Sequence, residues 1–247
     1  SDVYKRQLLP NCKNLKLPGT GTSVGSGLTE DRHSLYSMDF DGTSDYIDCG
    51  ISSELKPNLV SCSVWIKGSS SSNPQYTRIL SQDGPTGGAD AYGFYVTSTN
   101  KVVFAIKTSV TGTVTSSLSS VVLDNNWHNI VGTYDGSNVN IYVDGSIVGS
   151  PVSGTGNLAY GSGGFTIGCM SEPTALPSQE FTGQIDEVAI FSRALSLNEV
   201  NDLWNGGSPS NPMLLSGKPV AYYPLGEQAR NPNGSSDWRF PNEVLQG

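Results

Sequence analysis

Two acidic segments, far apart along the chain, carry the residues best suited to bind a metal ion. Residues 39–48 read DFDGTSDYID and residues 183–191 read GQIDEVAIF, each a short stretch of strand and turn. Calcium takes several oxygen ligands from carboxylates and backbone carbonyls. We therefore predict one structural Ca²⁺ held by Asp41, the carbonyl of Thr43 and Asp186. The alternative is that Asp41 and Asp186 only accept hydrogen bonds within turns and caps.

The same carboxylates do not form the pair that a glycosidase needs. Retaining glycosidases hold two carboxylates on either side of one glycosidic bond, for example in a Glu-x-Asp-x-x-Glu pattern along one strand. Here Gln184 stands two residues before Asp186, and Glu187 points to the opposite face of a regular strand. His33 and His128 are the two histidines, and no Ser-His-Asp or Cys-His grouping accompanies them. We predict no catalytic residues.

Aromatic side chains in loops are the residues that could stack on a sugar ring. We take Tyr76, Tyr92 and Tyr160 as the candidate ligand-binding residues, and Tyr95 and Trp238 belong to the same set. The alternative for each of these rings is packing in the protein core.

The composition limits the class of protein that carries these residues. A chain of 247 residues with 36% hydrophobic content can bury one large core. Its 14 basic and 22 acidic side chains give a net charge of −8, which repels nucleic-acid phosphates and anionic lipid surfaces. No apolar run is long enough to span a membrane, and the first residues do not show the basic, then apolar, then small-residue pattern expected of a signal peptide. We therefore expect neither a nucleic-acid partner nor membrane insertion.

The cysteines do not form a zinc or redox motif. Cys12, Cys49, Cys62 and Cys169 lack the close C-x-x-C spacing of such sites. We interpret Cys49 and Cys62 as small buried hydrophobic residues with free thiols, since a core of this size needs no disulfide. One or two disulfides are the alternative.

Strands account for almost all the elements that must position these residues. Runs with strand composition occupy residues 35–40, 46–49, 59–66, 77–81, 92–97, 101–106, 127–134 and 139–143. Clusters of Gly, Pro, Asn and Ser separate these runs, as in an all-β sandwich. Asp135-Gly136 and Asp144-Gly145 accept the positive φ of tight hairpins, so we predict turns at both dipeptides.

One short helix is predicted over residues 196–205. Ser196 can cap the first turn, and Glu199 three residues later can complete a capping box. Gly206 and Gly207 are expected to end the helix. Its apolar face consists of Leu197, Val200, Leu203 and Trp204.

Five segments in a fixed order carry a family resemblance. They are DFDGTSDYID at 39–48, SVWIK at 63–67, NWHNIVGTYDG at 126–136, IYVDG at 141–145 and GQIDEVAIFSRALS at 183–196. This series resembles the laminin-G-like, concanavalin A-like lectin/glucanase domains over residues 35–207. The resemblance implies an all-β jelly-roll sandwich of two curved antiparallel sheets, often with one structural calcium, used for carbohydrate or protein recognition outside cells. It also implies that Trp65, Trp127 and Trp204 are buried.

The chain departs from this family at its two ends. We divide it into an N-terminal segment 1–34, a core 35–207 and a tail 208–247, and residues 1–7 resemble the chance end of a truncated reading frame. The family opens with a strand of the type vaYYpL.E before the first acidic segment, but here PVAYYPLGE stands at 219–227. That strand could begin a following repeat, complete its own sheet or fill the vacant edge of a neighbouring copy. Its candidate assembly residues are Val220, Tyr222, Tyr223 and Leu225.

The sequence therefore predicts a noncatalytic carbohydrate- or protein-recognition and adhesion module, stabilised by calcium. We expect display in the extracellular space, on a cell surface or on a virion, with a glycan or a surface protein as partner. The alternative is a purely structural subunit of a filament, surface layer or capsid decoration that self-associates through its C-terminal strand. A glycoside hydrolase of the same fold is the less favoured third reading.

Overall fold

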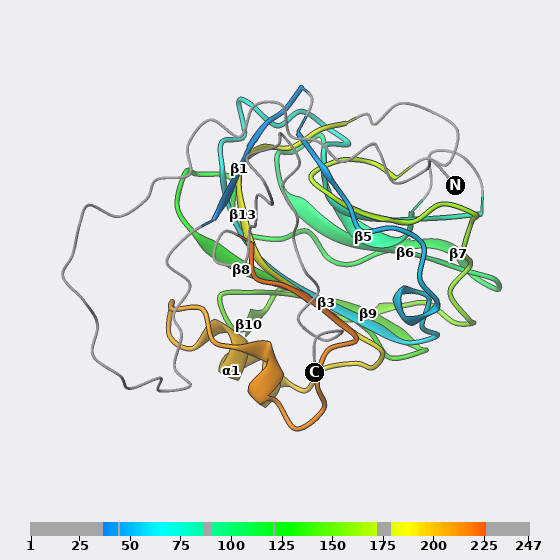
Figure 1. The fold of residues 1–247 in the computed structure, drawn as a ribbon. Helices are drawn as coiled ribbons and strands as arrows, with labels where there is room; N and C mark the ends of the chain where they lie inside the picture. The colour runs from blue at the N-terminus through cyan, green and yellow to red at the C-terminus, as the bar shows by residue number, and fades with distance from the viewer. Residues whose placement is uncertain (1–36, 44, 86–89, 121, 172–178, 226–247) are drawn as a thin grey trace, which may run out of the picture.

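The computed structural model describes residues 37–43, 45–85, 90–120, 122–171 and 179–225. Within these residues the chain forms two stacked antiparallel sheets with one short α-helix below them (Figure 1). The predicted all-β jelly-roll sandwich is confirmed. The predictions for Cys12, His33 and Trp238 concern residues that lie outside the described part of the chain.

The first sheet has eight strands and carries the second acidic segment. Its strands are β1 (Met38–Asp41), β3 (Val60–Gly68), β8 (His128–Tyr134), β9 (Asn138–Val143), β10 (Ser146–Ile147), β11 (Val152–Ser153), β13 (Thr182–Phe191) and β14 (Ala221–Tyr223). They follow the order β1-β13-β3-β8-β9-β10, while β11 pairs with β9 and β14 pairs with β13.

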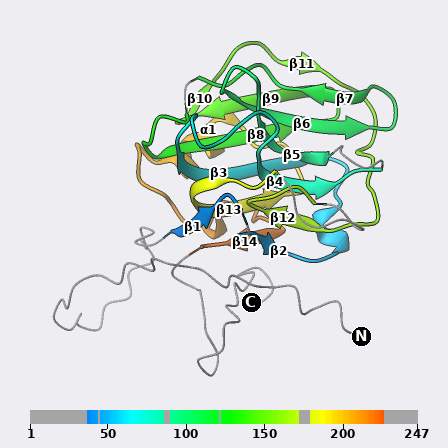
Figure 2. The ribbon, with the colours of Figure 1, turned by 90° about the horizontal axis from the view of Figure 1, so that it is seen from above.

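The second sheet has six strands and faces the viewer in Figure 2. Its strands are β2 (Ile47–Asp48), β4 (Arg78–Asp83), β5 (Asp90–Val96), β6 (Val102–Thr108), β7 (Gly112–Thr115) and β12 (Phe165–Ile167), in the order β2-β12-β4-β5-β6-β7. Among the described residues, the connections contain the 3₁₀ turns η2 (Ser53–Leu55) and η3 (Pro212–Leu214).

The core between the sheets is filled by side chains that alternate inward along each strand. Phe94 and Phe104 pack together with ring centroids 5.1 Å apart. Gly132 of β8 admits the ring of Phe104 from the opposite sheet, since a Cβ there would lie 2.2 Å from that ring. This close approach of the two sheets explains why a glycine interrupts an otherwise bulky strand.

The predicted hairpins form at both Asp-Gly dipeptides. Asp144 and Gly145 have φ of 50° and 77°, and the pair Val143–Ser146 closes the β9–β10 turn. Gly136 has φ of 93° in the turn between β8 and β9. Positive φ at these positions matches the twist of the flanking strands, and the prediction is confirmed.

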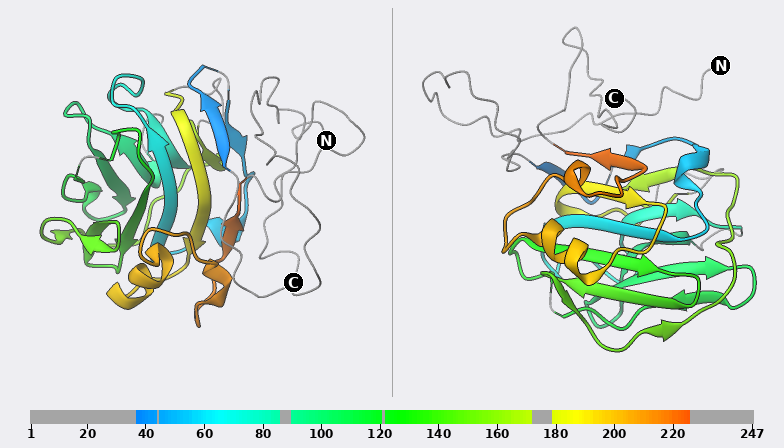
Figure 3. Two further views of the ribbon diagram at one scale, coloured as in Figure 1. Left: turned by 90° about the vertical axis from the view of Figure 1, so that its left-hand side faces the viewer. Right: turned by 90° about the horizontal axis from the view of Figure 1, so that it is seen from below.

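The predicted helix is α1 (Leu197–Trp204), and its capping box between Ser196 and Glu199 is present. The helix ends one residue earlier than expected, because Asn205 takes the left-handed conformation with φ of 44°. The helix lies against the outer face of the eight-stranded sheet (Figure 3). There Val200 and Leu203 pack in one apolar cluster with Val131, Ala189 and Phe191 of the sheet. Among the described residues, no helix is long and apolar enough to cross a membrane.

The C-terminal strand completes the sheet of its own chain in this structure. β14 pairs with residues 188–190 of β13, and β1 pairs with residues 182–185 of the same strand. The two strands therefore lie end to end along one edge of β13. Tyr222, Tyr223 and Leu225 are buried there, and Val220 is half-buried.

The three cysteines of the described chain are free thiols, as predicted for Cys49 and Cys62. Cys62 and Cys169 are buried and Cys49 is half-buried. Burial raises the pKa of Cys169 to about 12, so this thiol stays protonated at neutral pH.

Candidate functional site

The predicted calcium ligands fall on neighbouring strands but are not brought together. Asp41 pairs with Thr182 and Met38 pairs with Ile185, so Asp186 lies four residues further along β13 than the partner of Asp41. At about 3.3 Å per residue, this offset amounts to about 13 Å along the strand. Within the described ranges, no three His, Cys, Asp or Glu side chains converge on a possible metal site.

Asp41 instead organises the turn that follows β1. Its Oδ1 accepts hydrogen bonds from the backbone N–H of Thr43 at 2.8 Å and of Asp45 at 3.3 Å. Asp45 is buried, its Oδ2 accepts from the Asp41 N–H at 3.1 Å, and its Oδ1 has no hydrogen-bond partner. Burial and the nearby charge of Asp41 raise the pKa of Asp45.

The second acidic segment contains a β-bulge that the sequence pattern did not reveal. The register of β13 against β3 shifts between Asp186 and Ala189, and Glu187 has φ of 50°. Asp186 pairs with Trp65, while Glu187 accepts a 2.5 Å hydrogen bond from Tyr222, a residue of the cluster under α1. Both carboxylates thus belong to the outer face, so the expectation of opposite faces is wrong. Both residues are also buried.

Two of the three candidate ligand-binding tyrosines serve the core. Tyr92 is completely buried, and its hydroxyl donates to the carbonyl of Leu55 at 2.9 Å. Tyr160 is half-buried, packs edge-on against Tyr92 with centroids 6.3 Å apart, and donates to the carbonyl of Pro57. The prediction of a binding role for Tyr92 is wrong, because its position in β5 points into the core. Tyr160 fastens the segment after β2 to the sandwich.

Tyr76 is the candidate that the structure leaves accessible. It ends the loop between β3 and β4, and half of the residue, 50%, is exposed. Its backbone N–H donates to the carbonyl of Val96 at 2.7 Å, which ties the loop to the end of β5. Its ring lies against that of Tyr95, with centroids 6.1 Å apart and planes inclined by 42°. The loop therefore presents a supported aromatic surface.

A buried ion pair, Arg78–Asp90, contacts both tyrosines of this aromatic pair. The side chains of Arg78 in β4 and Asp90 in β5 form an ion pair, with Nε and Oδ2 2.7 Å apart and both side chains almost fully buried. In the ladder itself Arg78 pairs with Tyr95 and Asp90 pairs with Asp83. The Arg78 guanidinium lies 4.8 Å from the ring centroid of Tyr95 and donates to the carbonyl of Tyr76 at 2.7 Å. Ser81 donates to Asp90 at 2.6 Å. Burial raises the pKa of Asp90, while the charge of Arg78 opposes that rise.

Arg78 also forms hydrogen bonds with two residues whose backbones have an unfavourable positive φ. Seven described residues other than glycine have positive φ, and four of them are Asn or Asp, which tolerate it. The other three are Tyr76, Gln179 and Glu187. Arg78 contacts two of these, because its backbone N–H donates to the carbonyl of Gln179 at 2.8 Å and its side chain holds the carbonyl of Tyr76. Strained backbone conformations cluster at functional sites and persist only where the surrounding structure holds them.

Sequence reasoning found Tyr76 but missed the residues that hold it. Arg78 and Asp90 lie in strand segments without any motif, and their pairing depends on the β4–β5 register. The three tryptophans assigned to the core also differ. Trp65 is buried as expected, whereas Trp204 is half-buried and Trp127 is 37% exposed, so the expectation is wrong for Trp127.

Comparisons with known proteins agree with this architecture. A laminin-G model described as the concanavalin A-like lectin/glucanases superfamily matches residues 41–201. No curated protein sequence matches the chain. A protein of Bacteroides ovatus ATCC 8483 to which carbohydrate binding is ascribed is similar in structure, with a TM-score of 0.57 and 16% identity, over 84% of this chain and 57% of that chain.

The receptor-binding domain of botulinum neurotoxin mosaic serotype C/D is similar over 69% of this chain and 42% of that chain, with a TM-score of 0.51 and 14% identity. The chain thus spans about half the length of these two structures. At such low identity, the likeness establishes the fold alone.

Proposed function

Because the chain belongs to the concanavalin A-like lectin/glucanases superfamily, we propose that it is a noncatalytic module that recognises carbohydrate through Tyr76. The observation that carries this proposal is the half-exposed residue Tyr76, whose ring packs at a tilt against Tyr95 and whose backbone carbonyl is bound by Arg78 of the Arg78–Asp90 ion pair.

The chemistry of this surface suits a pyranose ring. The apolar face of a sugar packs on an aromatic ring, while amides exchange hydrogen bonds with its hydroxyl groups. Gln75 and Gln179 are exposed, the first beside Tyr76 in the chain and the second bound to Arg78 through its backbone carbonyl. Since the ion pair already fixes Tyr76, little conformational entropy is lost when a ligand binds.

The state of the acidic residues supports a binding role over hydrolysis. A glycosidase must expose its carboxylate pair to substrate. Asp186 and Glu187 are each about 95% buried, with exposed fractions of 5% and 6%, and Glu187 is bonded to Tyr222.

We place the proposed calcium ion at the Asp41–Asp45 turn instead of between Asp41 and Asp186. A cation there would give the buried Asp45 Oδ1 the partner that it lacks and would offset the repulsion between the two carboxylates. Backbone carbonyls such as that of Thr43 would complete the ligand set. Calorimetric titration with CaCl₂ tests this directly, and an unchanged melting temperature in EDTA would argue against it.

We also propose display outside the cell or on a virion, where glycans and surface proteins are accessible. The purely structural alternative requires that the C-terminal strand be donated to a neighbouring copy. The pairing of β14 with β13 of its own chain gives that alternative no specific support.

An array of neutral and acidic oligosaccharides, probed with the full chain, tests the proposed function. We expect at least one glycan to bind and the Tyr76→Ala variant to bind it at least tenfold more weakly. Tyr76→Phe keeps the ring and should bind almost normally. Ile51→Ala is the matched control, because Ile51 is 69% exposed and follows β2 at the other end of the six-stranded sheet. A blank array, or full binding by Tyr76→Ala, would refute the assignment.

A further inference from the structure

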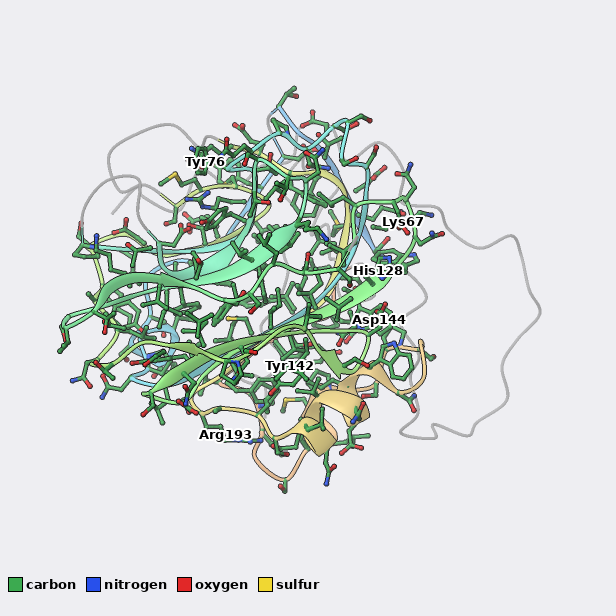
Figure 4. The ribbon with its side chains drawn as sticks, turned by 180° about the vertical axis from the view of Figure 1, so that it is seen from behind. Lys67, Tyr76, His128, Tyr142, Asp144 and Arg193 are labelled. Carbon is green, nitrogen blue, oxygen red and sulfur yellow. The ribbon has the colours of Figure 1, made fainter. Side chains whose placement is uncertain are left out.

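We propose a second carbohydrate-binding site, centred on Trp127, which takes a neutral oligosaccharide. Trp127 is 37% exposed at the start of β8, although its place in the sequence pattern assigns it to the core. A large exposed aromatic residue surrounded by polar groups is the arrangement that binds a sugar face. This surface is distinct from the one at Tyr76, which lies on the other side of Figure 4 from Lys67 and His128.

The turn that presents Trp127 is fixed by its own hydrogen bonds. Asp124 accepts from the backbone N–H of Asn126 at 2.9 Å and from its side-chain amide at 3.1 Å. Asn125 takes a left-handed conformation with φ of 67°, and its N–H donates to the carbonyl of Gly68 at 2.8 Å. Trp127 therefore follows an ordered turn that is hydrogen-bonded to Gly68, the last residue of β3.

The residue after Trp127 is held on both sides. The Nδ1 of His128 lies 2.7 Å from Asp144 Oδ2, and its Nε2 lies 3.2 Å from Asp124 Oδ1. Asp144 also accepts from the backbone N–H of Asn129 at 3.0 Å, so the β9–β10 turn is joined to the start of β8. Lys67, His128 and Asp144 follow one another along one side of the molecule in Figure 4. These contacts fix the direction of the backbone at Trp127.

Cross-strand register places Lys67 beside the tryptophan. Ile66 pairs with His128 in the β3–β8 ladder, so Lys67 is opposite Trp127, just beyond the last pair. Lys67 as a residue is half-buried. The Lys67 ammonium can donate to a sugar hydroxyl, Asn126 can donate to and accept from others, and Asp124 can accept from them.

These surroundings favour a neutral sugar over a protein or an acidic glycan. A protein interface would need further apolar side chains around the anchor, but the residues next to Trp127 in the chain are Asn126 and His128, and the residue opposite it in the ladder is Lys67. The carboxylates of Asp124 and Asp144, which bind the two ring nitrogens of His128, lie near Trp127. Together with the net charge of −8 on the chain, they disfavour an acidic ligand.

Tryptophan fluorescence of the full chain tests this proposal with cellohexaose, laminarihexaose, xylohexaose and chitohexaose as probes, and with an alginate hexamer as the acidic arm. We expect at least one neutral hexasaccharide to change the emission and to protect it from iodide quenching. Calorimetric titration, which does not depend on the removed indole, should show that Trp127→Ala binds that probe at least tenfold more weakly. Trp127→Phe keeps the packing of the turn and should lose the fluorescence change. Ile147→Ala, at an exposed apolar residue of β10, should bind normally.

The outcomes separate this site from the one at Tyr76. The Tyr76→Ala variant should retain the fluorescence response of Trp127, whether or not it loses the ligand proposed for Tyr76. The response at Trp127 is therefore expected even if the assignment of the Tyr76 site fails. The proposal is overturned if no neutral probe changes the emission, if Trp127→Ala binds the probe like the parent chain, or if binding is confined to alginate and depends on Lys67 alone.

Discussion

Replacing Tyr76 by glycine should separate the binding role of this residue from its effect on stability. Tyr76 has φ of 74°, a conformation that costs a residue with a Cβ about 1–2 kcal/mol and costs glycine almost nothing. Tyr76→Ala removes the ring and keeps the strain. Tyr76→Gly removes the ring and releases the strain. Both variants should lose glycan binding equally, because both lack the aromatic surface.

The expected difference in stability follows from two opposing terms. Release of the strain favours glycine by about 1–2 kcal/mol, while the greater freedom of glycine in the unfolded chain favours alanine by about 0.5–1 kcal/mol. The two terms differ by about 0.75 kcal/mol at their midpoints, so Tyr76→Gly should exceed Tyr76→Ala in free energy of unfolding by about this amount. For a chain of this size, this difference corresponds to about 1–4 °C in melting temperature. Both variants also lose the contact with Tyr95, worth about 0.5–1.5 kcal/mol.

Urea unfolding of both variants, beside the same two substitutions at Tyr95, provides the test. Tyr95 lies inside β5 without a positive φ, so alanine should be more stable than glycine there, by about 0.5–1 kcal/mol. The order of the two residues should thus invert between positions 76 and 95. If glycine is the less stable residue at both positions, Tyr76 is not strained, and the argument for a strained binding site at Arg78 is incorrect.

Three further predictions concern the supports of the fold and of the site. Gln179→Gly should raise the free energy of unfolding by about 0.5–1 kcal/mol in urea, because φ of 59° strains an exposed glutamine. Asp90→Ala should cost about 3–5 kcal/mol in thermal unfolding and should weaken glycan binding, because it leaves Arg78 buried without its counter-charge. Two hydrogen bonds from Arg193 lower the pKa of Glu199 to about 2 from its ordinary 4.5, so this pair stabilises the protein above pH 4.5, and the stability is lost as the pH falls toward 2. Glu199→Gln should remove that acid-sensitive contribution, about 1 kcal/mol for a partly exposed pair.

Each of these predictions has a contrary result. Gln179→Ala is the control for the first, since alanine keeps the strain, and equal stability of the two variants would contradict it. A loss below about 1 kcal/mol for Asp90→Ala would mean that solvent reaches the ion pair. Identical pH profiles between pH 2 and 5 for the parent chain and Glu199→Gln would show that the Arg193–Glu199 pair adds no stability.

The sequence sufficed for features that depend on neighbours in the chain. The hairpin at Asp144-Gly145 follows from the two residues that must accept positive φ. The helix start follows from Ser196 and Glu199, which bond each other's backbone across one turn. Strand positions followed from apolar composition between turn signals, and most observed strands lie within two residues of the predicted runs.

Residues that meet only through long-range register could not be placed in this way. Asp41 and Asp186 do reach adjacent strands, but the β1–β13 pairing sets them four residues apart. No local pattern specifies that offset, since sliding one strand by two residues keeps the same faces inward. The bulge at Glu187 then moved a carboxylate to the outer face, and its sequence, Asp-Glu-Val-Ala, carries no glycine that would mark it.

The exposure of Tyr76, on which the proposed recognition depends, also could not be predicted from the sequence. Tyr92 and Tyr76 are both tyrosines beside polar loops, yet one is completely buried and the other half exposed. The difference comes from strand alternation at Tyr92 and from a left-handed backbone at Tyr76, and only the first is encoded by neighbouring residues. The second is sustained by Arg78, whose charge is balanced by Asp90 on another strand. A strained residue persists only where such distant support outweighs its cost, so the binding surface depends on tertiary pairing that a linear pattern does not contain.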